Sequence, residues 1–272
     1  MNTRALILAA VAATSLFGQT SEQPAGGVNL METKTYSAQE NGELIRLYEG
    51  LRVTDVSDGM DMVGLPNTGL VSHEIHAAWV DTENMSHVMR GIAATARLVP
   101  TQQPDRPKPG EDFEAWRPKF NSPDDRKAFE GIIKPGIILV LDDVEDKDIG
   151  TIGSRNILAW VKLGAVGVIT DAGARDTDEI ALQKVPLYIR KKGRGIRPGR
   201  NELESVNRPV SIGGVLVCPG DVVVADGDGI VVVPRAVARP VAHYAKELMQ
   251  KDKAARRNLY ERLGKPLDKT VR

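Results

Sequence analysis

The sequence predicts a mixed α/β domain, and three observations carry that prediction. Short runs rich in Val and Ile alternate with helical segments between residues 137 and 189, which is typical of a buried parallel sheet. Val-rich runs joined by tight turns follow over residues 210–234, which is typical of antiparallel hairpins. A long charged helix is expected over residues 235–263. Residues 28–272 are therefore expected to form a single domain.

The first 27 residues have the three-part layout of a secretory signal. Arg4 precedes an apolar run from Ala5 to Ala13, and small or polar residues follow it. The run is too short to span a bilayer. We expect residues 1–27 to be a signal peptide with a short linker, and the protein to be exported to the periplasm. The alternative is an ordinary N-terminal helix in a cytoplasmic protein.

Two helices and a strand are expected next. Ser37–Leu51 places its apolar residues at helical spacing. Thr54–Met62 resembles the start of a second helix, with Ser57 and Asp58 as candidate N-caps. Arg90–Leu98 is expected to be the first strand of the core.

A proline-rich segment interrupts this pattern over residues 99–126. It holds six of the sixteen prolines of the chain, together with Phe113, Trp116 and Phe120. Proline removes a backbone donor, so this segment is expected to contain neither a strand nor a long helix. It is interpreted either as an ordered insertion or lid, or as a loose surface loop.

The regular part of the chain follows the insertion. Five elements alternate there, and the strands contain mostly branched apolar residues. They are strands at Ile137–Leu141, Gly167–Thr170 and Val185–Ile189, and helices at Arg155–Leu163 and Thr177–Gln183.

The charge balance excludes some classes of partner. The 36 basic residues equal the 36 acidic residues, which argues against a nucleic-acid-binding protein and against attachment to an anionic membrane. Two opposed clusters lie within this balance, with five acids over Asp142–Asp148 and six bases over Arg190–Arg200. The basic cluster either serves a larger, polyanionic substrate or is a solvated loop that contacts a neighbouring subunit. The single cysteine, Cys218, rules out an intramolecular disulfide.

Several common catalytic motifs are absent from the sequence. It contains no phosphate-binding Gly-rich loop, no dinucleotide-binding Gly-x-Gly-x-x-Gly after a strand, and no Gly-x-Ser-x-Gly elbow. His73 and His76 are expected to be a solvated pair because no third metal ligand accompanies them.

The most informative stretch is Gly164–Asp176. A strand and a turn of small residues deliver Arg175 and Asp176 to the carboxyl end of the strand, which is where ligands bind in α/β sheets. An arginine fork can bind a carboxylate, and an aspartate can hold a hydrated cation such as Mg²⁺. The alternative is a surface pair in which Asp176 or Thr177, with Glu179, caps the following helix.

The stretch Gly-Val-Ile-Thr-Asp-Ala-Gly-Ala-Arg-Asp, residues 167–176, resembles a signature of the RraA-like family. The run from Pro219 to Pro234 resembles the second signature of that family. The family includes the regulator of ribonuclease activity A and the divalent-metal aldolases for 4-hydroxy-4-methyl-2-oxoglutarate and 4-carboxy-4-hydroxy-2-oxoadipate. The resemblance implies a swivelling β/β/α domain, here with a proline-rich insertion, that assembles as a homotrimer or hexamer.

The resemblance also implies roles for individual residues. Arg175 would bind the carboxylate of the substrate, and Asp176 would bind the metal. Backbone amides at a helix N-terminus would bind the same carboxylate, which suits an anion physically; this position falls on Gly153, Ser154, Arg155 and Asn156. The aldolases usually carry an acid where this chain has Ser154. Asp252 would complete the metal site of a neighbouring subunit.

The function implied by the resemblance is that of a lyase dependent on Mg²⁺ or Mn²⁺. It would cleave a 2-oxo acid to release pyruvate, and the same site would decarboxylate oxaloacetate. One alternative is a non-catalytic regulator, although the regulator subgroup lacks the acid that Asp176 supplies here. Another is a protein that binds or processes sugar acids. The sequence does not identify the natural substrate.

Overall fold

The computed structural model describes residues 29–102, 107–120, 122–143 and 148–272. The expected signal peptide and linker, residues 1–27, lie outside these residues. The chain divides into two compact units, Met1–Glu32 and Thr33–Arg272, and every element described below belongs to the second unit. None of the described helices combines the length and apolar character needed to cross a bilayer.

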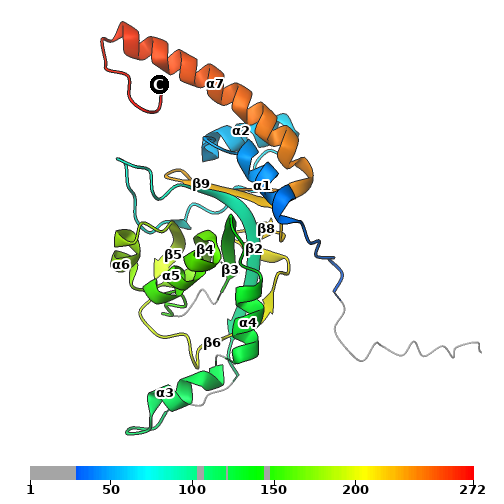
Figure 1. Cartoon of the computed structure of the whole chain (residues 1–272), viewed down its shortest axis with the longest axis vertical. Helices are drawn as coiled ribbons and strands as arrows, with labels where there is room; N and C mark the ends of the chain where they lie inside the picture. Colours follow the sequence, from blue (N-terminus) through cyan, green and yellow to red (C-terminus); the bar gives the residue numbers. More distant parts are fainter. Residues whose placement is uncertain (1–28, 103–106, 121, 144–147) are drawn as a thin grey trace, which may run out of the picture. The chain divides into compact units, whose positions relative to one another are not determined.

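An eight-stranded mixed sheet organises residues 33–272 (Figure 1). The strands lie in the order β1, β5, β4, β3, β2, β9, β10, and β6 also pairs with β2. A separate hairpin pairs β7 with β8. The bounds of the strands are β1 His76–Ala77, β2 Met89–Pro100, β3 Ile137–Asp142, β4 Ala165–Ala174, β5 Leu187–Lys192, β6 Asn201–Val206, β7 Val210–Ile212, β8 Val215–Val217, β9 Val222–Asp226 and β10 Gly229–Val233.

The predicted parallel portion of the sheet is confirmed. Strands β2, β3, β4 and β5 pair in parallel, with Ile92 opposite Ile137 and Thr170 opposite Ile189. The expected hairpins are also present, because β7 with β8 and β9 with β10 are antiparallel. β5 begins at Leu187 and not at Val185, since the intervening Pro186 has no N–H to donate to a ladder.

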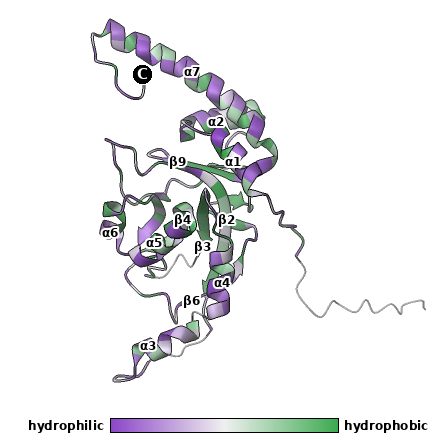
Figure 2. Cartoon of the chain, in the orientation of Figure 1, coloured by the Kyte–Doolittle hydropathy of each residue, from purple (hydrophilic) through white to green (hydrophobic). Residues whose placement is uncertain are grey.

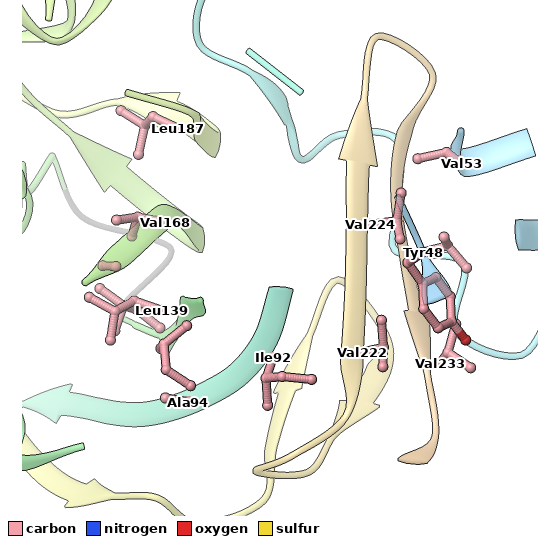
Figure 3. Packing of buried hydrophobic residues seen from close by; sticks show 14 of the residues in the cluster. Tyr48, Val53, Ile92, Ala94, Leu139, Val168, Leu187, Val222, Val224 and Val233 are labelled. Atoms are coloured by element: carbon pink, nitrogen blue, oxygen red, sulfur yellow. The ribbon is translucent and has the colours of Figure 1, made fainter. Parts of the chain in front are cut away.

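Side chains from the two faces of the sheet form two apolar clusters. Alternate strand residues belong to opposite clusters, as the two-residue period of a strand requires. The first cluster packs against α1 (Ala38–Leu47), α2 (Val53–Met62), α5 (Ser154–Leu163) and α7 (Ala238–Arg262). The second packs against the β7–β8 hairpin. Figure 3 shows part of the first cluster, from β9 and β10 to the parallel strands, with labels on Tyr48, Val53, Ile92, Ala94, Leu139, Val168, Leu187, Val222, Val224 and Val233.

The C-terminal helix is the predicted long element, preceded by a 3₁₀ turn, η2 (Arg235–Val237). It packs closely on α2, because a β-carbon added at Gly59 would lie 2.6 Å from the carbonyl oxygen of Val241. Its buried residues lie in the first third of the helix, at Ala238, Val241, Ala242 and Ala245. The remaining turns carry mainly polar residues, which are purple in Figure 2.

The predicted caps of α2 are wrong. The helix starts earlier than Ser57 and Asp58, which lie inside it, and Arg52 occupies the N-cap position. The carboxylate of Asp55 accepts the Arg52 backbone N–H at 2.9 Å and its Nη2 at 2.6 Å. An aspartate at the third helical position therefore stabilises the start of this helix. This arrangement is harder to recognise in a sequence than a Ser or Asp at the N-cap.

The proline-rich segment contains short helices. It holds α3 (Phe113–Trp116) and η1 (Arg117–Phe120), and α4 (Pro123–Gly131) begins inside it, while residues 103–106 and 121 lie outside the described residues. The expectation of no strand fails at its first two residues, because β2 continues to Pro100. Trp116 and Phe120 are buried with ring centroids 5.0 Å apart. Over residues 107–120 the segment is thus ordered, and the loose-loop interpretation is wrong.

Asp171 is a largely buried acid near the carboxyl end of β4. Its Oδ1 accepts the backbone N–H of Asp143 at 3.1 Å, and its carbonyl oxygen accepts Nε of Arg190 at 3.0 Å. Burial raises the pKa of Asp171 to about 7, and the nearby Asp142 adds to this effect. The folded protein therefore holds this proton at pH values where the unfolded chain has released it.

Replacing Asp171 by Asn tests that burial. The unfolded carboxyl ionises near pH 4 and the folded one near pH 7, so wild-type stability falls as the pH rises through this window and stays lower above it. We expect D171N to match the wild type near pH 4 and to exceed its free energy of unfolding by about 1–3 kcal/mol at pH 8. Urea unfolding at both pH values measures the difference. D228N removes the same charge from an exposed turn, and an equal gain in D228N would contradict the assignment.

Candidate functional site

Arg175 and Asp176 lie directly after β4, at the edge of the sheet where the parallel strands end. The pairing of β4 with β5 shifts register between Thr170 and Gly173, so the end of the strand is irregular. Asp176 adopts a left-handed backbone conformation, with φ 56° and ψ 35°. Only a few residue types tolerate this conformation, and Asp is one of them.

The segment from Asp148 to Gly153 holds this turn in place through backbone contacts. Its backbone bonds to both neighbouring strand ends: Gly150 N–H donates to Gly195 O at 2.8 Å, and Arg175 N–H donates to Ile152 O at 2.8 Å. The approach is so close that a β-carbon at Gly173 or Gly193 would lie 2.3 or 2.0 Å from the carbonyl oxygen of Ile149. Glycine is required at both positions because no side chain fits there.

The carboxylate of Asp176 points to the N-terminus of α5. Its Oδ2 accepts the backbone N–H of Ser154 at 3.2 Å and lies 3.5 Å from the Ser154 hydroxyl. Its Oδ1 is 4.0 Å from Nε of Arg175. The interpretation of Asp176 as the side-chain cap of its own helix, α6 (Thr177–Leu182), is wrong, because Asp176 occupies that N-cap position without a side-chain capping bond.

The residues around Asp176 fit a hydrated divalent cation. The carboxylate is a hard oxygen donor with 38% of its side chain exposed. Gly153 leaves space beside it, because a β-carbon there would lie 2.7 Å from Oδ2. Within the described residues no cluster of three or more His, Cys, Asp or Glu side chains forms. One carboxylate with water and substrate oxygens suits Mg²⁺ or Mn²⁺, whereas Zn²⁺ usually takes three or four protein ligands.

The other predicted substrate-binding residues lie at the same place. Gly153 is the N-cap of α5, and Ser154, Arg155 and Asn156 form its first turn. Arg155 and Asn156 are exposed. Free N–H groups and the helix dipole favour an anion at such a helix start. The structure therefore brings all five predicted substrate-binding residues and Asp176, one of the two predicted metal ligands, into one neighbourhood, and the roles themselves stay predictions.

An open pocket of about 420 Å³ adjoins the Arg175–Asp176 turn. Its walls come from the end of β4, the first turn of α6 and the end of β5. The lining residues are Ala174, Arg175, Asp176, Thr177, Asp178, Glu179, Lys192, Gly193 and Arg194. The volume is within the range of sites for small molecules.

Asp252 lies on α7 and is ion-paired within its own chain. Its Oδ2 is 3.1 Å from Nη2 of Arg52 and 2.9 Å from Nε of Arg256. Its side chain is still 47% exposed, so both ion pairs lie at the surface of the helix. Its predicted role toward a neighbouring subunit stays a prediction, and these two arginines would be its competing partners.

The basic cluster over residues 190–200 is mostly engaged in structural contacts. Arg190 pairs with Glu74, and Arg194 pairs with Asp148 at 2.7 Å. Arg197 is largely buried and donates to the carbonyl oxygen of Phe120 at 2.8 Å. Arg194 is nevertheless 88% exposed, so the cluster combines a solvated part with the more buried Arg197. Part of the acidic cluster neutralises part of the basic one.

Sequence reasoning missed the residues that hold the site in place. Gly150, Gly173 and Gly193 make the close backbone contacts, and the only sequence signal was their position next to strand ends. Asn201 is fully buried, and its Nδ2 donates to Asp143 and to the Thr151 hydroxyl, which ties the segment 148–153 to β6. A lone Asn in a polar run gives no sequence signal for this role.

The fold and this site define an α/β protein with an adjacent arginine and aspartate at the carboxyl edge of the parallel part of its sheet. The RraA-like profile, described as Aldolase/RraA, matches residues 53–232, well over half of the chain. The chain therefore belongs to the RraA-like family, and its fold is of the predicted type.

Individual relatives are more distant. A Halalkalibacterium halodurans protein provisionally named a 4-hydroxy-4-methyl-2-oxoglutarate aldolase is 30% identical over 124 residues, or 45% of this chain and 58% of that protein. The aldolase of that name from Thermus thermophilus is 34% identical over 90 residues, or 30% of this chain and 49% of that protein. The chain thus spans about half the length of the curated relatives it matches.

The structure of Streptomyces coelicolor RraAS2, described as an unusual member of the RNase ES inhibitor RraA family, has a similar fold. The TM-score is 0.65 at 22% identity, over 79% of this chain and 98% of that chain. This likeness concerns the fold alone.

Replacing Gly153 by Ala tests the contact beneath Asp176. The added β-carbon would lie 2.7 Å from Oδ2 and displace the carboxylate. We expect the affinity for Mn²⁺, measured by calorimetry, to fall at least about tenfold, while the free energy of unfolding changes by less than about 1 kcal/mol. The matched control is G131A, whose β-carbon meets nothing within 4 Å. Wild-type Mn²⁺ affinity in G153A would contradict the geometry.

Proposed function

We propose that the protein is a divalent-metal-dependent lyase that cleaves a 2-oxo acid and releases pyruvate, and that it also decarboxylates oxaloacetate. One observation carries this proposal. Arg175 and Asp176 are adjacent, and the left-handed turn sends the carboxylate toward α5 and leaves both side chains partly exposed at one sheet edge. A carboxylate-binding group and a cation-binding group are thereby fixed side by side.

Arg175 is assigned to the carboxylate of the substrate. Its side chain is 42% exposed, and its Nε is no closer than 4.0 Å to Asp176, so the planar fork remains available to an external anion. A guanidinium binds a carboxylate through two parallel hydrogen bonds, which orients the substrate as well as holding it. The first turn of α5 begins close to Arg175 and supplies further N–H groups, since a β-carbon at its N-cap Gly153 would lie 3.5 Å from Nε of Arg175.

Asp176 is assigned to Mg²⁺ or Mn²⁺. When bound, the cation supplies an electrophile that stabilises negative charge developing on the 2-oxo group. The Ser154 N–H holds one carboxylate oxygen, which restricts the rotation of the side chain. The names of the relatives support a lyase, because they specify an aldolase acting on a 2-oxo acid.

Ser154 changes the proton chemistry of this site. A hydroxyl 3.5 Å from Asp176 can donate a hydrogen bond but cannot serve as a carboxylate base. We propose that a second acid comes from Asp252 of a neighbouring subunit in a homo-oligomer. Asp252 would have to exchange at least one of its two arginine partners to do so.

Asp176→Asn tests the proposed function. Pyruvate release is measured with oxaloacetate and with 4-hydroxy-4-methyl-2-oxoglutarate, each with Mg²⁺, with Mn²⁺ and with chelator. We expect the wild type to require the cation and D176N to lose at least about 100-fold in kcat/KM, because the amide is a weaker ligand than the carboxylate.

The matched control is D61N, which removes an exposed aspartate of α2 and should keep wild-type rates. Unchanged oxaloacetate decarboxylation in D176N, or full wild-type activity in chelator, would overturn the assignment.

A further inference from the structure

The pocket beside Arg175 has a second cationic wall. Lys192 is the last residue of β5, and its Cα pairs with Ala174 in the parallel ladder, one residue before Arg175. Neighbouring strands lie about 4.8 Å apart, so the two cationic residues start from adjacent positions at the edge of the sheet. Both line the same pocket.

Lys192 differs from the other bases of its segment. Arg194 also lines the pocket, but Asp148 accepts its backbone N–H at 2.8 Å and its Nε at 2.7 Å. Arg190 is held by Glu74 and by the carbonyl oxygen of Asp171. Lys192 is exposed, and none of the described residues forms an ion pair or hydrogen bond with its ammonium group. Its charge is available to a ligand in the pocket.

The acids of the pocket do not neutralise Lys192. Asp178 and Glu179 also line the pocket, and neither forms an ion pair with Lys192 among the described contacts. They lie in the first turn of α6, where the helix dipole favours them. Asp176 points to Ser154.

We propose that Lys192 is a specificity-determining residue that binds a second carboxylate of the 2-oxo acid held by Arg175. This inference rests on the proposed function and deepens it. The names of the relatives specify a 2-oxo dicarboxylate, but nothing in them says which side chain reads the second carboxylate. In this chain the pocket geometry points to the ammonium group of Lys192, which lines the pocket on the strand next to Arg175.

The test uses two ligands that differ only at the far end. 2-Oxoglutarate has a second carboxylate, and 2-oxopentanoate has a methyl group at that position. Neither carries the 4-hydroxyl needed for retro-aldol cleavage, so binding is measured by calorimetry without turnover. The full-length protein is used with Mg²⁺ at low ionic strength, because salt screens exposed charges.

We expect Lys192→Gln to weaken 2-oxoglutarate binding about tenfold and to leave 2-oxopentanoate binding within twofold of the wild type. K192R should retain most of the preference for the dicarboxylate. The matched control is K162Q, which removes an exposed lysine from the far end of α5 and should change neither affinity.

Each of the other possible results either supports or overturns the role of Lys192. Equal loss for both ligands in K192Q, or no loss for either, overturns the role of Lys192. A wild type that binds neither ligand overturns this inference together with the proposed ligand class. The protein could also prefer 2-oxoglutarate through Lys192 and yet cleave or decarboxylate no 2-oxo acid. That result supports the role of Lys192 and overturns only the proposed lyase activity.

Discussion

The site depends on one close backbone contact, the passage of residues 148–153 between the ends of β4 and β5. The Ile149 carbonyl oxygen fits there only because Gly173 and Gly193 have no β-carbon. The resulting hydrogen bond from Arg175 N–H to Ile152 O holds the start of the turn. That turn then places the Asp176 carboxylate against α5. The close packing of backbone atoms, more than any ion pair, thus determines where Arg175 and Asp176 lie at the edge of the sheet.

The zero net charge conceals a structural pairing of opposite clusters. Asp148 binds Arg194, and Asp143 contributes to the electrostatic environment of buried Arg197, so acids after β3 meet bases after β5. These contacts join the two segments that flank the Arg175–Asp176 turn. Within the basic run, Arg190 and Arg194 are the two residues matched by an acid in these contacts. Lys192 differs from these arginines because it pairs with Ala174 at the end of the strand ladder and lines the pocket.

Local patterns predicted the central strands and helices, since branched apolar runs and 3.6-residue periods are local signals. β6 (NELESV) was not predicted, because it is a polar strand that follows no alternating pattern and exists through its pairing with β2. The adjacency of Arg175 and Asp176 was visible in the sequence. The direction of the Asp176 carboxylate was not, because it depends on a left-handed turn and on the start of α5 at Gly153 and Ser154, more than twenty residues earlier in the chain.

The most direct test of the central claim is a crystal structure of the protein with Mn²⁺ and pyruvate, with the metal located by anomalous scattering. We expect one manganese peak on the Asp176 carboxylate, with the carboxylate of pyruvate bound by Arg175. Manganese ordered elsewhere, with Asp176 contacting only Ser154 and Arg175 contacting no pyruvate, would contradict this expectation.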